Sequence, residues 1–266
     1  MHIDQLLHLA RQSQLNGEPL SVPDNWAQGR TLFGGVSAAL LYEAVRQHVK
    51  PDSRLRSITT NFVGPLAPDQ PFNIQVEVLR EGKNVTQVVA RAVQDSQVAV
   101  FCQACFGMDR ESKIQVSNQD FHQMPLPKKA KFIPQIPKVT PKFLRHMDLA
   151  LIEGGLPFTG KKTSSTYGWM RFTEAPETIT DAHLIALIDA WPPTILQMLR
   201  WPSPASTMSW NLEFVHPHAP VAPDDWFAYQ ADTRQAADGY CHSEANIWDA
   251  RGELVAISRQ IITVFG

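Results

Sequence analysis

The stretch "FVGPLAPDQPF" at residues 62–72 decides how the chain is organised, because the second half of the sequence repeats its landmarks. "FVHP" at 214–217 corresponds to the first four residues of this stretch, and "APDDWF" at 222–227 corresponds to "APDQPF" at 67–72. The order of the landmarks is kept, and their spacing drifts by only a few residues. The 266-residue chain is therefore expected to contain two tandem copies of one supersecondary unit.

Each copy begins with an apolar helical segment and continues as a series of strands. "GGVSAALLYEAVRQHV" at 34–49 opens the first copy, and "HLIALIDAWPPTILQML" at 183–199 opens the second. The second segment is apolar nearly all round, which is typical of a helix enclosed by other elements. "FNIQVEVL" at 72–79 alternates apolar and polar residues with the period of a strand, and similar segments follow in both copies. This pattern predicts an α+β unit in which an antiparallel sheet wraps a long central helix.

The connection between the copies differs in composition from both of them. Residues 108–142 include "MPLPKKAKFIPQIPKVTPK", a stretch rich in Pro and Lys that forms a poor core and a good extended linker. The expected organisation is an N-terminal unit at 1–107, a linker at 108–142 and a C-terminal unit at 143–266.

Composition excludes several classes of function. With 24 basic and 26 acidic residues, the net charge of -2 provides no field for binding nucleic acid. The odd count of three cysteines is typical of a reduced intracellular compartment. The amino terminus lacks the charge and apolar pattern of a signal peptide, and no uncharged apolar run of about eighteen residues predicts a membrane span. We expect a cytoplasmic protein that binds neither nucleic acid nor membrane.

Asp189 is the only charged residue in the apolar segment 183–199. Burying an isolated carboxylate in apolar surroundings costs free energy on the order of several kcal/mol unless the group is hydrogen-bonded or protonated. Asp189 therefore requires partners, and a hydroxyl and an amide from neighbouring strands would supply them. A structural carboxylate that caps or anchors the helix remains the alternative interpretation.

Four motifs carry a resemblance to a known family. They are "LFGG" at 32–35, "LIDAW" at 187–191, "STMSWNLEF" at 206–214 and "RGELVAISRQ" at 251–260. With these motifs the sequence resembles the double hotdog thioesterases, and within them the acyl-CoA thioesterase II type. The resemblance implies a tandem (double) hotdog fold over nearly the whole chain outside the linker. One departure is Val36, where family sequences often have Gln after the paired glycines.

The resemblance also implies a site. In this family an Asp, a Thr or Ser, and a Gln from the second half hold the attacking water, and they carry over to Asp189, Thr207 and Gln260. Burial tends to raise the pKa of a carboxylate, so Asp189 could act as the base. Backbone N–H groups of Gly34 and Gly35, at the start of the first helix, could stabilise the oxyanion. Taken singly, Thr207 and Gln260 could equally be ordinary strand residues.

The first copy lacks these residue types at the matching places. Ser37 corresponds to Asp189 in the repeat, and Leu55-Arg56 lie near the place of Thr207. One working site per chain is therefore expected.

The predicted function is hydrolysis of a fatty acyl-CoA thioester to a free acid and coenzyme A. No metal or organic cofactor is expected, and the resemblance implies a homodimer, because exposed sheet edges and backs in hotdog proteins usually pair. "KKAK" at 128–131 could meet the phosphates of coenzyme A, although a solvated linker is the favoured interpretation. "CQAC" at 102–105 lacks a second cysteine pair, and a strand would point Cys102 and Cys105 to opposite faces.

Two alternatives remain open. One is an acyl-CoA or lipid-binding module that has the scaffold without turnover. The other is a hotdog dehydratase, which requires a histidine facing a carboxylate across the cleft. His183 is not one or two helical turns from Asp189, so the dehydratase fits poorly.

Overall fold

The structure is a computed structural model that describes residues 1–130 and 132–265. Lys131, the last residue of the basic run 128–131, and Gly266, the last residue of the predicted C-terminal unit, lie outside the described residues. The helices are α1 (Ile3–Asn16), α2 (Gly34–Arg46) and α3 (Asp181–Ile188), with the 3-10 turns η1 (Asp24–Trp26), η2 (Lys142–His146) and η3 (Thr194–Met198). The strands are β1 (Ala27–Gln28), β2 (Thr31–Leu32), β3 (Arg54–Phe62), β4 (Asn73–Glu81), β5 (Val85–Gln94), β6 (Gln97–Gly107), β7 (Met147–Glu153), β8 (Thr166–Phe172), β9 (Ala205–Phe214), β10 (Phe227–Ala237), β11 (Tyr240–Trp248) and β12 (Leu254–Val264).

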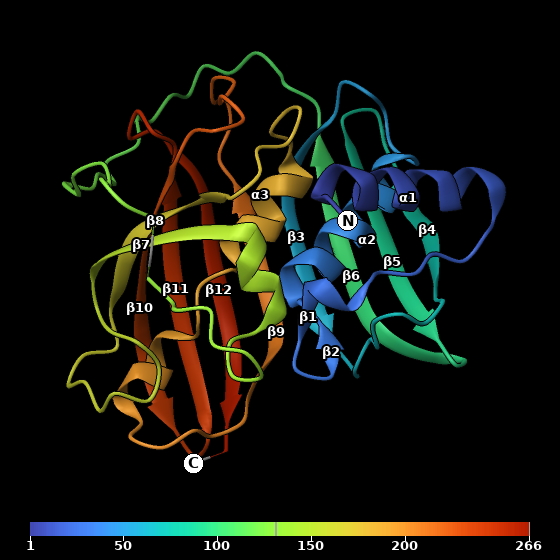
Figure 1. The fold of residues 1–266 in the computed structure, drawn as a ribbon. Coiled ribbons are helices and arrows are strands. Elements are labelled where there is room, and N and C mark those ends of the chain that lie inside the picture. The colour runs from blue at the N-terminus through green and yellow to red at the C-terminus, as the bar shows by residue number, and fades with distance from the viewer. Residues whose placement is uncertain (131, 266) are drawn as a thin grey trace.

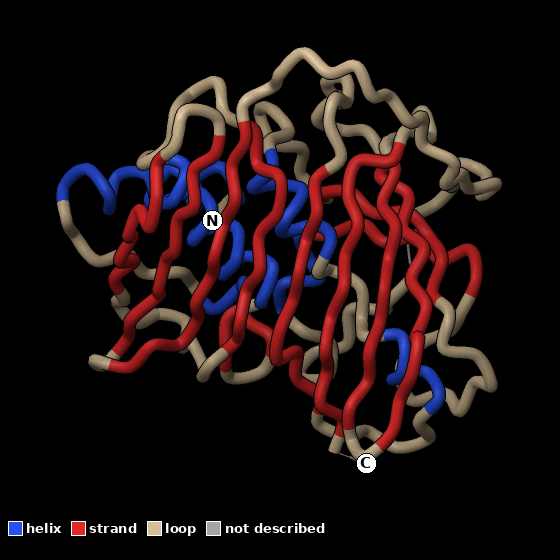
Figure 2. The backbone as a smooth tube through the Cα atoms, turned by 180° about the vertical axis from the view of Figure 1, so that it is seen from behind, coloured by secondary structure: helices blue, strands red, loops and turns tan. Residues whose placement is uncertain are grey.

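One antiparallel sheet of ten strands runs through the described chain, in the order β4-β5-β6-β3-β9-β12-β11-β10-β8-β7. Figure 1 shows the helices on one side of this sheet, and Figure 2 shows the strands side by side from the other side. The first repeat consists of α2 followed by β3 to β6, and the second consists of α3 followed by β9 to β12. The predicted tandem hotdog fold is confirmed.

The two repeats join where β3 pairs with β9. Thr59 lies opposite Asn211, and the side-chain amide of Asn211 donates a hydrogen bond of 2.9 Å to the Thr59 hydroxyl. These two residues also correspond in the repeat, since each lies three positions before the Phe of "FVGP" or "FVHP". The repeats are therefore related by a local two-fold axis that passes through this pair.

The two central helices lie side by side in opposite directions. Near the start of α2, Gly35 faces the backbone carbonyl of Ala186 in the last turn of α3. Farther along α2, the Tyr42 hydroxyl donates a hydrogen bond of 3.1 Å to Asp181 at the start of α3. Every residue of α3 from Ala182 to Ile188 is buried, which agrees with the apolar character of its sequence. None of the described helices is both long and apolar enough to cross a membrane.

The second central helix is shorter than the segment 183–199 predicted. It ends at Ile188, and the chain resumes a helical turn only at η3. A residue that precedes proline is disfavoured in the α-helical conformation, so Pro192-Pro193 exclude a continuous helix here. Asp189 is consequently the residue that follows the helix and not one in its middle.

The sequence patterns did not anticipate α1, β7 and β8. The two strands extend the sheet at the edge of the second repeat, since β8 pairs with β10 and β7 pairs with β8, and α1 packs on α2. Their apolar alternation is short, and neither has a counterpart before the first central helix. The repeat alone therefore gave no guide to them.

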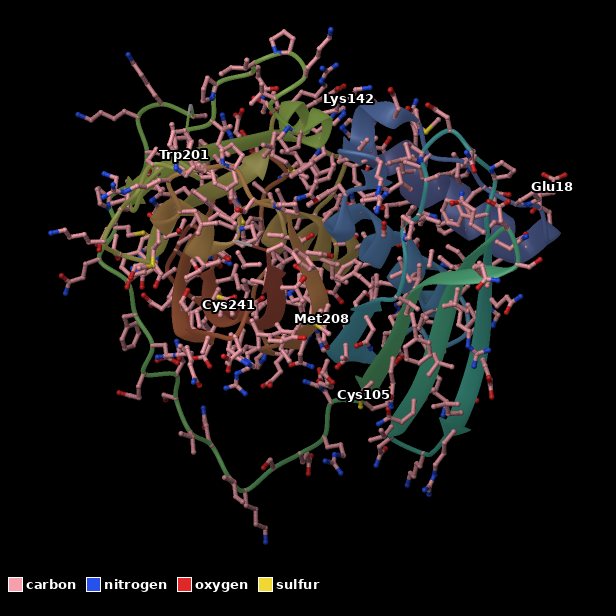
Figure 3. The ribbon with its side chains drawn as sticks, turned by 90° about the horizontal axis from the view of Figure 1, so that it is seen from below. Glu18, Cys105, Lys142, Trp201, Met208 and Cys241 are labelled. Carbon is pink, nitrogen blue, oxygen red and sulfur yellow. The ribbon has the colours of Figure 1, made fainter. Side chains whose placement is uncertain are left out.

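The connection between the repeats is extended, but part of it packs against the sheet. Its described residues from 108 to 141 form no helix or strand. The indole N–H groups of Trp169 and Trp248 donate hydrogen bonds of 2.9 Å to the carbonyls of Pro125 and Asp120. The His122 ring lies 5.2 Å from both indole rings. Figure 3 shows the green segment leaving the first repeat near Cys105 on its way to the second. It is thus more firmly attached than a solvated linker.

Candidate active site

Asp189 lies at the carboxyl end of α3 and is half-buried, and protein atoms closely surround its carboxylate. The side-chain amide of Gln260 donates a hydrogen bond of 3.1 Å to Oδ1 of Asp189. Burial raises the pKa of this carboxyl group from 3.8 to about 7, although hydrogen bonds from Gln260 and from the backbone of Gly35 act in the opposite direction. Desolvation outweighs both bonds, so the group can take up and release a proton near neutral pH.

Thr207 and Gln260 extend this hydrogen-bonded chain to the neighbouring strands. The Thr207 hydroxyl lies 3.4 Å from Oε1 of Gln260 and acts as the donor. Since Oε1 accepts from Thr207, the amide nitrogen of Gln260 faces Asp189. The structure therefore brings together the three side chains that the resemblance selected, one each from β9, β12 and the end of α3.

A β-bulge at Met208 sets the direction of the Thr207 side chain. Ser209 lies opposite Ile261, and Thr207 lies opposite Ile262, which leaves Met208 without a partner on β12. In a regular strand, residues three positions apart point to opposite faces. The extra residue instead places Thr207 on the helix-facing side together with Trp210, which is buried. The local sequence gives no sign of this bulge.

The first repeat has the same bulge without the polar groups. Arg56 is the unpaired residue of β3, at the position that corresponds to Met208. The register then places Leu55 where the second repeat has Thr207, and Ala104 where it has Gln260. Leu55 and Ala104 are both fully buried. The first repeat therefore cannot form an equivalent hydrogen-bonded chain.

The amino end of α2 closes one side of the site. A Cβ at Gly34 would lie 2.8 Å from Oδ2 of Asp189, so glycine permits the close approach of helix and carboxylate. The Gly35 backbone donates to the same carboxylate. Ser37, the expected counterpart of Asp189, instead donates to a backbone carbonyl of its own helix. The paired glycines thus lie against Asp189, and their oxyanion role stays a prediction.

Two aromatic residues, Tyr229 and Trp191, form another side of the site. Burial, followed by the charge of Asp189, raises the pKa of Tyr229. The Trp191 ring stacks on Tyr229 with 5.6 Å between the ring centres. Glycine at 168 makes room for this ring, because a Cβ there would lie 2.5 Å from Trp191. Tyr229 lies in a predicted strand, but nothing in its sequence context points toward Asp189.

The remaining candidate residues lie outside this site. His183 is hydrogen-bonded to Asp4 at 2.9 Å and to the Thr180 hydroxyl at 2.8 Å, both at the far end of α3 from Asp189. Cys102 and Cys105 are free thiols on β6. Within the described residues, no group of three His, Cys, Asp or Glu side chains is arranged to hold a metal ion.

Comparison with protein families identifies both halves of the chain. The model of the acyl-CoA thioesterase C-terminal domain matches residues 119–264, and that of the N-terminal domain matches residues 22–107. The chain is also similar to acyl-CoA thioesterase 2 of Haemophilus influenzae. The two are 22% identical over 289 residues, which cover 97% of this chain and 96% of that protein.

Solved structures share the fold over almost the full length. A hot dog fold protein of unknown function from Alicyclobacillus acidocaldarius superposes with a TM-score of 0.79 at 23% identity, covering 94% of each chain. An acyl-CoA thioesterase II from Mycobacterium marinum gives a TM-score of 0.68 at 19% identity, covering 92% of this chain and 91% of that one.

Proposed function

The chain belongs to the acyl-CoA thioesterase family and is of the acyl-CoA thioesterase II type, and on this basis we propose that it hydrolyses fatty acyl-CoA thioesters to a free acid and coenzyme A. One observation supports the proposal above all others. The half-buried carboxylate of Asp189 has a pKa of about 7 and is linked through Gln260 to the Thr207 hydroxyl. A water held by these groups would have a base, an orienting amide and an orienting hydroxyl.

The proposed reaction needs only these side chains and the substrate. Ionised Asp189 accepts a proton from the water as the water oxygen attacks the thioester carbon, and the carbonyl oxygen becomes an oxyanion. The oxyanion then collapses, and the bond between carbon and sulfur breaks. The proton on Asp189 passes to the departing thiolate. Because the pKa of a thiol is about 8.5, the thiolate leaves without a strong acid.

The backbone N–H groups of the paired glycines would donate first to Asp189 and then to the oxyanion. In the resting site the Gly35 backbone donates to the Asp189 carboxylate. When Asp189 takes the proton from water, it loses its negative charge and becomes a weaker acceptor. The N–H groups of Gly34 and Gly35 at the start of α2 would then be available to donate to the oxyanion, which forms at the same moment.

The C-terminal unit, residues 143–266, carries the proposed catalytic residues, and the first repeat contributes the start of α2. A dehydratase is disfavoured because both ring nitrogens of His183 are engaged at the far end of α3. Homodimerisation and a cytoplasmic location stay predictions, which light scattering and cell fractionation test.

The test is Asp189→Asn, assayed by thiol release from acyl-CoA esters of short, medium and long chains. We expect turnover to fall about a thousandfold, with the fold unchanged, because the amide cannot act as a base. Asp181→Asn, at the other end of the same helix, is the matched control and should keep wild-type rates. Equal rates for Asp189→Asn and wild type would reject the assignment. Tight acyl-CoA binding by a wild type that releases no thiol would favour the binding module.

A further inference from the structure

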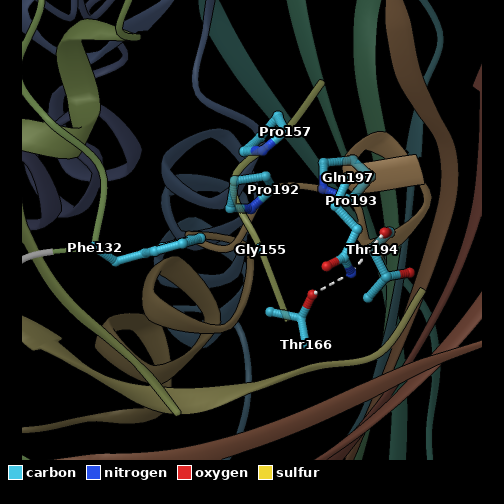
Figure 4. A pocket seen from close by; sticks show the side chains of 8 residues that line it. All are labelled: Phe132, Gly155, Pro157, Thr166, Pro192, Pro193, Thr194 and Gln197. Atoms are coloured by element: carbon cyan, nitrogen blue, oxygen red, sulfur yellow. Dashed lines mark hydrogen bonds between the residues drawn. The ribbon is translucent and has the colours of Figure 1, made fainter. Parts of the chain in front are cut away.

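A small recess lies at the turn that follows Asp189. Figure 4 shows it between Phe132 of the connection, the loop after β7 that contains Gly155 and Pro157, and the turn 192–197. The space that a water-sized group can occupy is about 10 Å³. This is roughly the room needed by one water-sized polar group.

Gln197 presents an acceptor to this recess. Its amide nitrogen donates hydrogen bonds of 2.9 Å to the carbonyl of Ser165 and 3.1 Å to that of Thr194. Carbonyl oxygens can only accept, so these two bonds determine which end of the amide is nitrogen. The oxygen must therefore point the other way, and Figure 4 shows it directed into the recess.

The oxygen of Gln197 is buried and has no hydrogen-bond partner among the described residues. The side chain as a whole is 2% exposed. A Cβ at Gly154 would lie 3.3 Å from this oxygen, so glycine leaves its surroundings unfilled. A buried acceptor without a donor is unfavourable, which indicates that a donor from outside the chain belongs here.

The recess is close to Asp189. Pro192, on its wall, follows Asp189 by three residues, and three residues span at most roughly 11 Å. Phe132, on the opposite wall, packs on Trp191 with 5.6 Å between ring centres, and Trp191 stacks on Tyr229 beside Asp189. The recess is therefore within reach of a molecule that reacts at Asp189.

We propose that Gln197 accepts a hydrogen bond from the first amide N–H of the pantetheine arm of the substrate. This inference rests on the proposed thioesterase function. In a coenzyme A thioester, two methylene groups separate the sulfur from this amide nitrogen, so the N–H is the nearest donor to the reacting carbon. A site that holds this N–H rejects analogues without it, because the buried acceptor is then left unpaired. Gln197 is thus a positioning and specificity residue, whereas Asp189 performs the chemistry.

The experiment compares two truncated substrates that carry the same acyl group. One is the S-acyl-N-acetylcysteamine thioester, which keeps the amide N–H. The other replaces that N–H by oxygen and is the S-acyl thioester of O-acetylmercaptoethanol. We expect wild-type kcat/KM to be about 30-fold or more lower for the oxygen analogue.

Variants separate this role from a structural one. Gln197→Met should reduce the ratio between the two substrates to about threefold or less, since it removes the acceptor. Gln235→Met, at an exposed position, should keep the wild-type ratio. Because the wild-type comparison needs no mutation, it can overturn the inference even if Gln197→Met does not fold.

Two results would overturn the inference, and they differ. Equal wild-type rates with both truncated substrates would mean that water alone occupies the recess, while the thioesterase function stands. Failure of the wild type to hydrolyse both of these compounds and the acyl-CoA esters would overturn the proposed function together with this inference.

Discussion

A methyl group added at Gly34 would lie 2.8 Å from Oδ2 of Asp189 and 3.0 Å from the ring of Phe62. Both distances are shorter than van der Waals contact, so the helix start and the carboxylate fit together only because position 34 has no side chain. The geometry of the site thus depends on a residue of the first repeat, although the proposed base lies in the second.

Gly34→Ala should displace the Asp189 carboxylate or push α2 away from α3. We expect turnover to fall about tenfold or more and the free energy of unfolding to decrease by about 1–3 kcal/mol, as in other overpacked interiors. Acyl-CoA hydrolysis and urea unfolding measure the two effects. Gly64→Ala is the control, because its added methyl group would meet only one atom, at 3.9 Å. A Gly34→Ala variant with normal turnover would show that the contact is not essential to the site.

The raised pKa of Asp189 predicts the pH dependence of the reaction. Only the ionised carboxylate can accept a proton from water, and burial raises its pKa to about 7. Below this value, kcat/KM should fall about tenfold for each pH unit, and above it the rate should level off. A profile that stayed flat down to about pH 5 would rule out Asp189 as the base.

The ionisation of Asp189 should also affect stability: the free energy of unfolding should fall as the pH rises, whereas the activity rises. The pKa of Asp189 is about 7 in the folded chain against an ordinary value of 3.8, so folding favours the protonated form. This contribution is fully present below about pH 4 and is lost as the pH rises through about 7. Urea unfolding at about pH 5 and about pH 8 should show the loss in the wild type and a smaller loss in Asp189→Asn. Identical pH dependence in both proteins would contradict the raised pKa.

The bulge in β9 directs the Thr207 side chain into the site, and substitutions of Thr207 test whether its hydroxyl is needed there. Thr207→Val keeps the shape of the side chain and removes the hydroxyl, so we expect a loss of about 100-fold in turnover with little change in stability. Thr207→Ser keeps the hydroxyl and should retain most of the activity. Ser206→Ala, at the exposed neighbouring position, should have no effect. An active Thr207→Val would remove this hydroxyl from the proposed mechanism.

The contact between the connection and the sheet can be weakened at one atom. Trp248→Phe keeps a buried ring but loses the N–H that donates to Asp120. We expect a loss of about 1 kcal/mol in the free energy of unfolding and faster proteolysis within 108–130. Trp201→Phe is the control, because Trp201 is 80% exposed. If both variants are cleaved at the wild-type rate, the hydrogen bond does not hold the connection in place.

Much of the fold could be predicted because its signals are local. The segment 72–79, expected to be a strand, lies almost entirely in β4 from Asn73 to Glu81, and the first central helix begins at Gly34 as expected. Strand alternation and the repeat of "APD" landmarks depend only on neighbouring residues. The early end of α3 was also foreseeable in outline, since Pro192-Pro193 follow closely.

The shape of the site could not be predicted in the same way. Thr207 and Trp210 are three residues apart, so alternation alone places them on opposite faces of β9. The bulge at Met208 reverses this, and bulges arise from pairing with the neighbouring strand. Similarly, Trp169 and Trp248 donate to backbone carbonyls of the connection. Every residue has a backbone carbonyl, so the sequence does not indicate which ones accept these bonds.

The local two-fold axis at Thr59 and Asn211 relates two repeats of one chain, and this explains why the repeats can differ so much. Two separate, identical chains joined along such an axis would carry every substitution twice, so neither pocket could change without the other. Covalent linkage removes that constraint. In the first repeat, apolar Leu55 and Ala104 occupy the positions of Thr207 and Gln260. This repeat can then evolve as a scaffold that supports the second repeat.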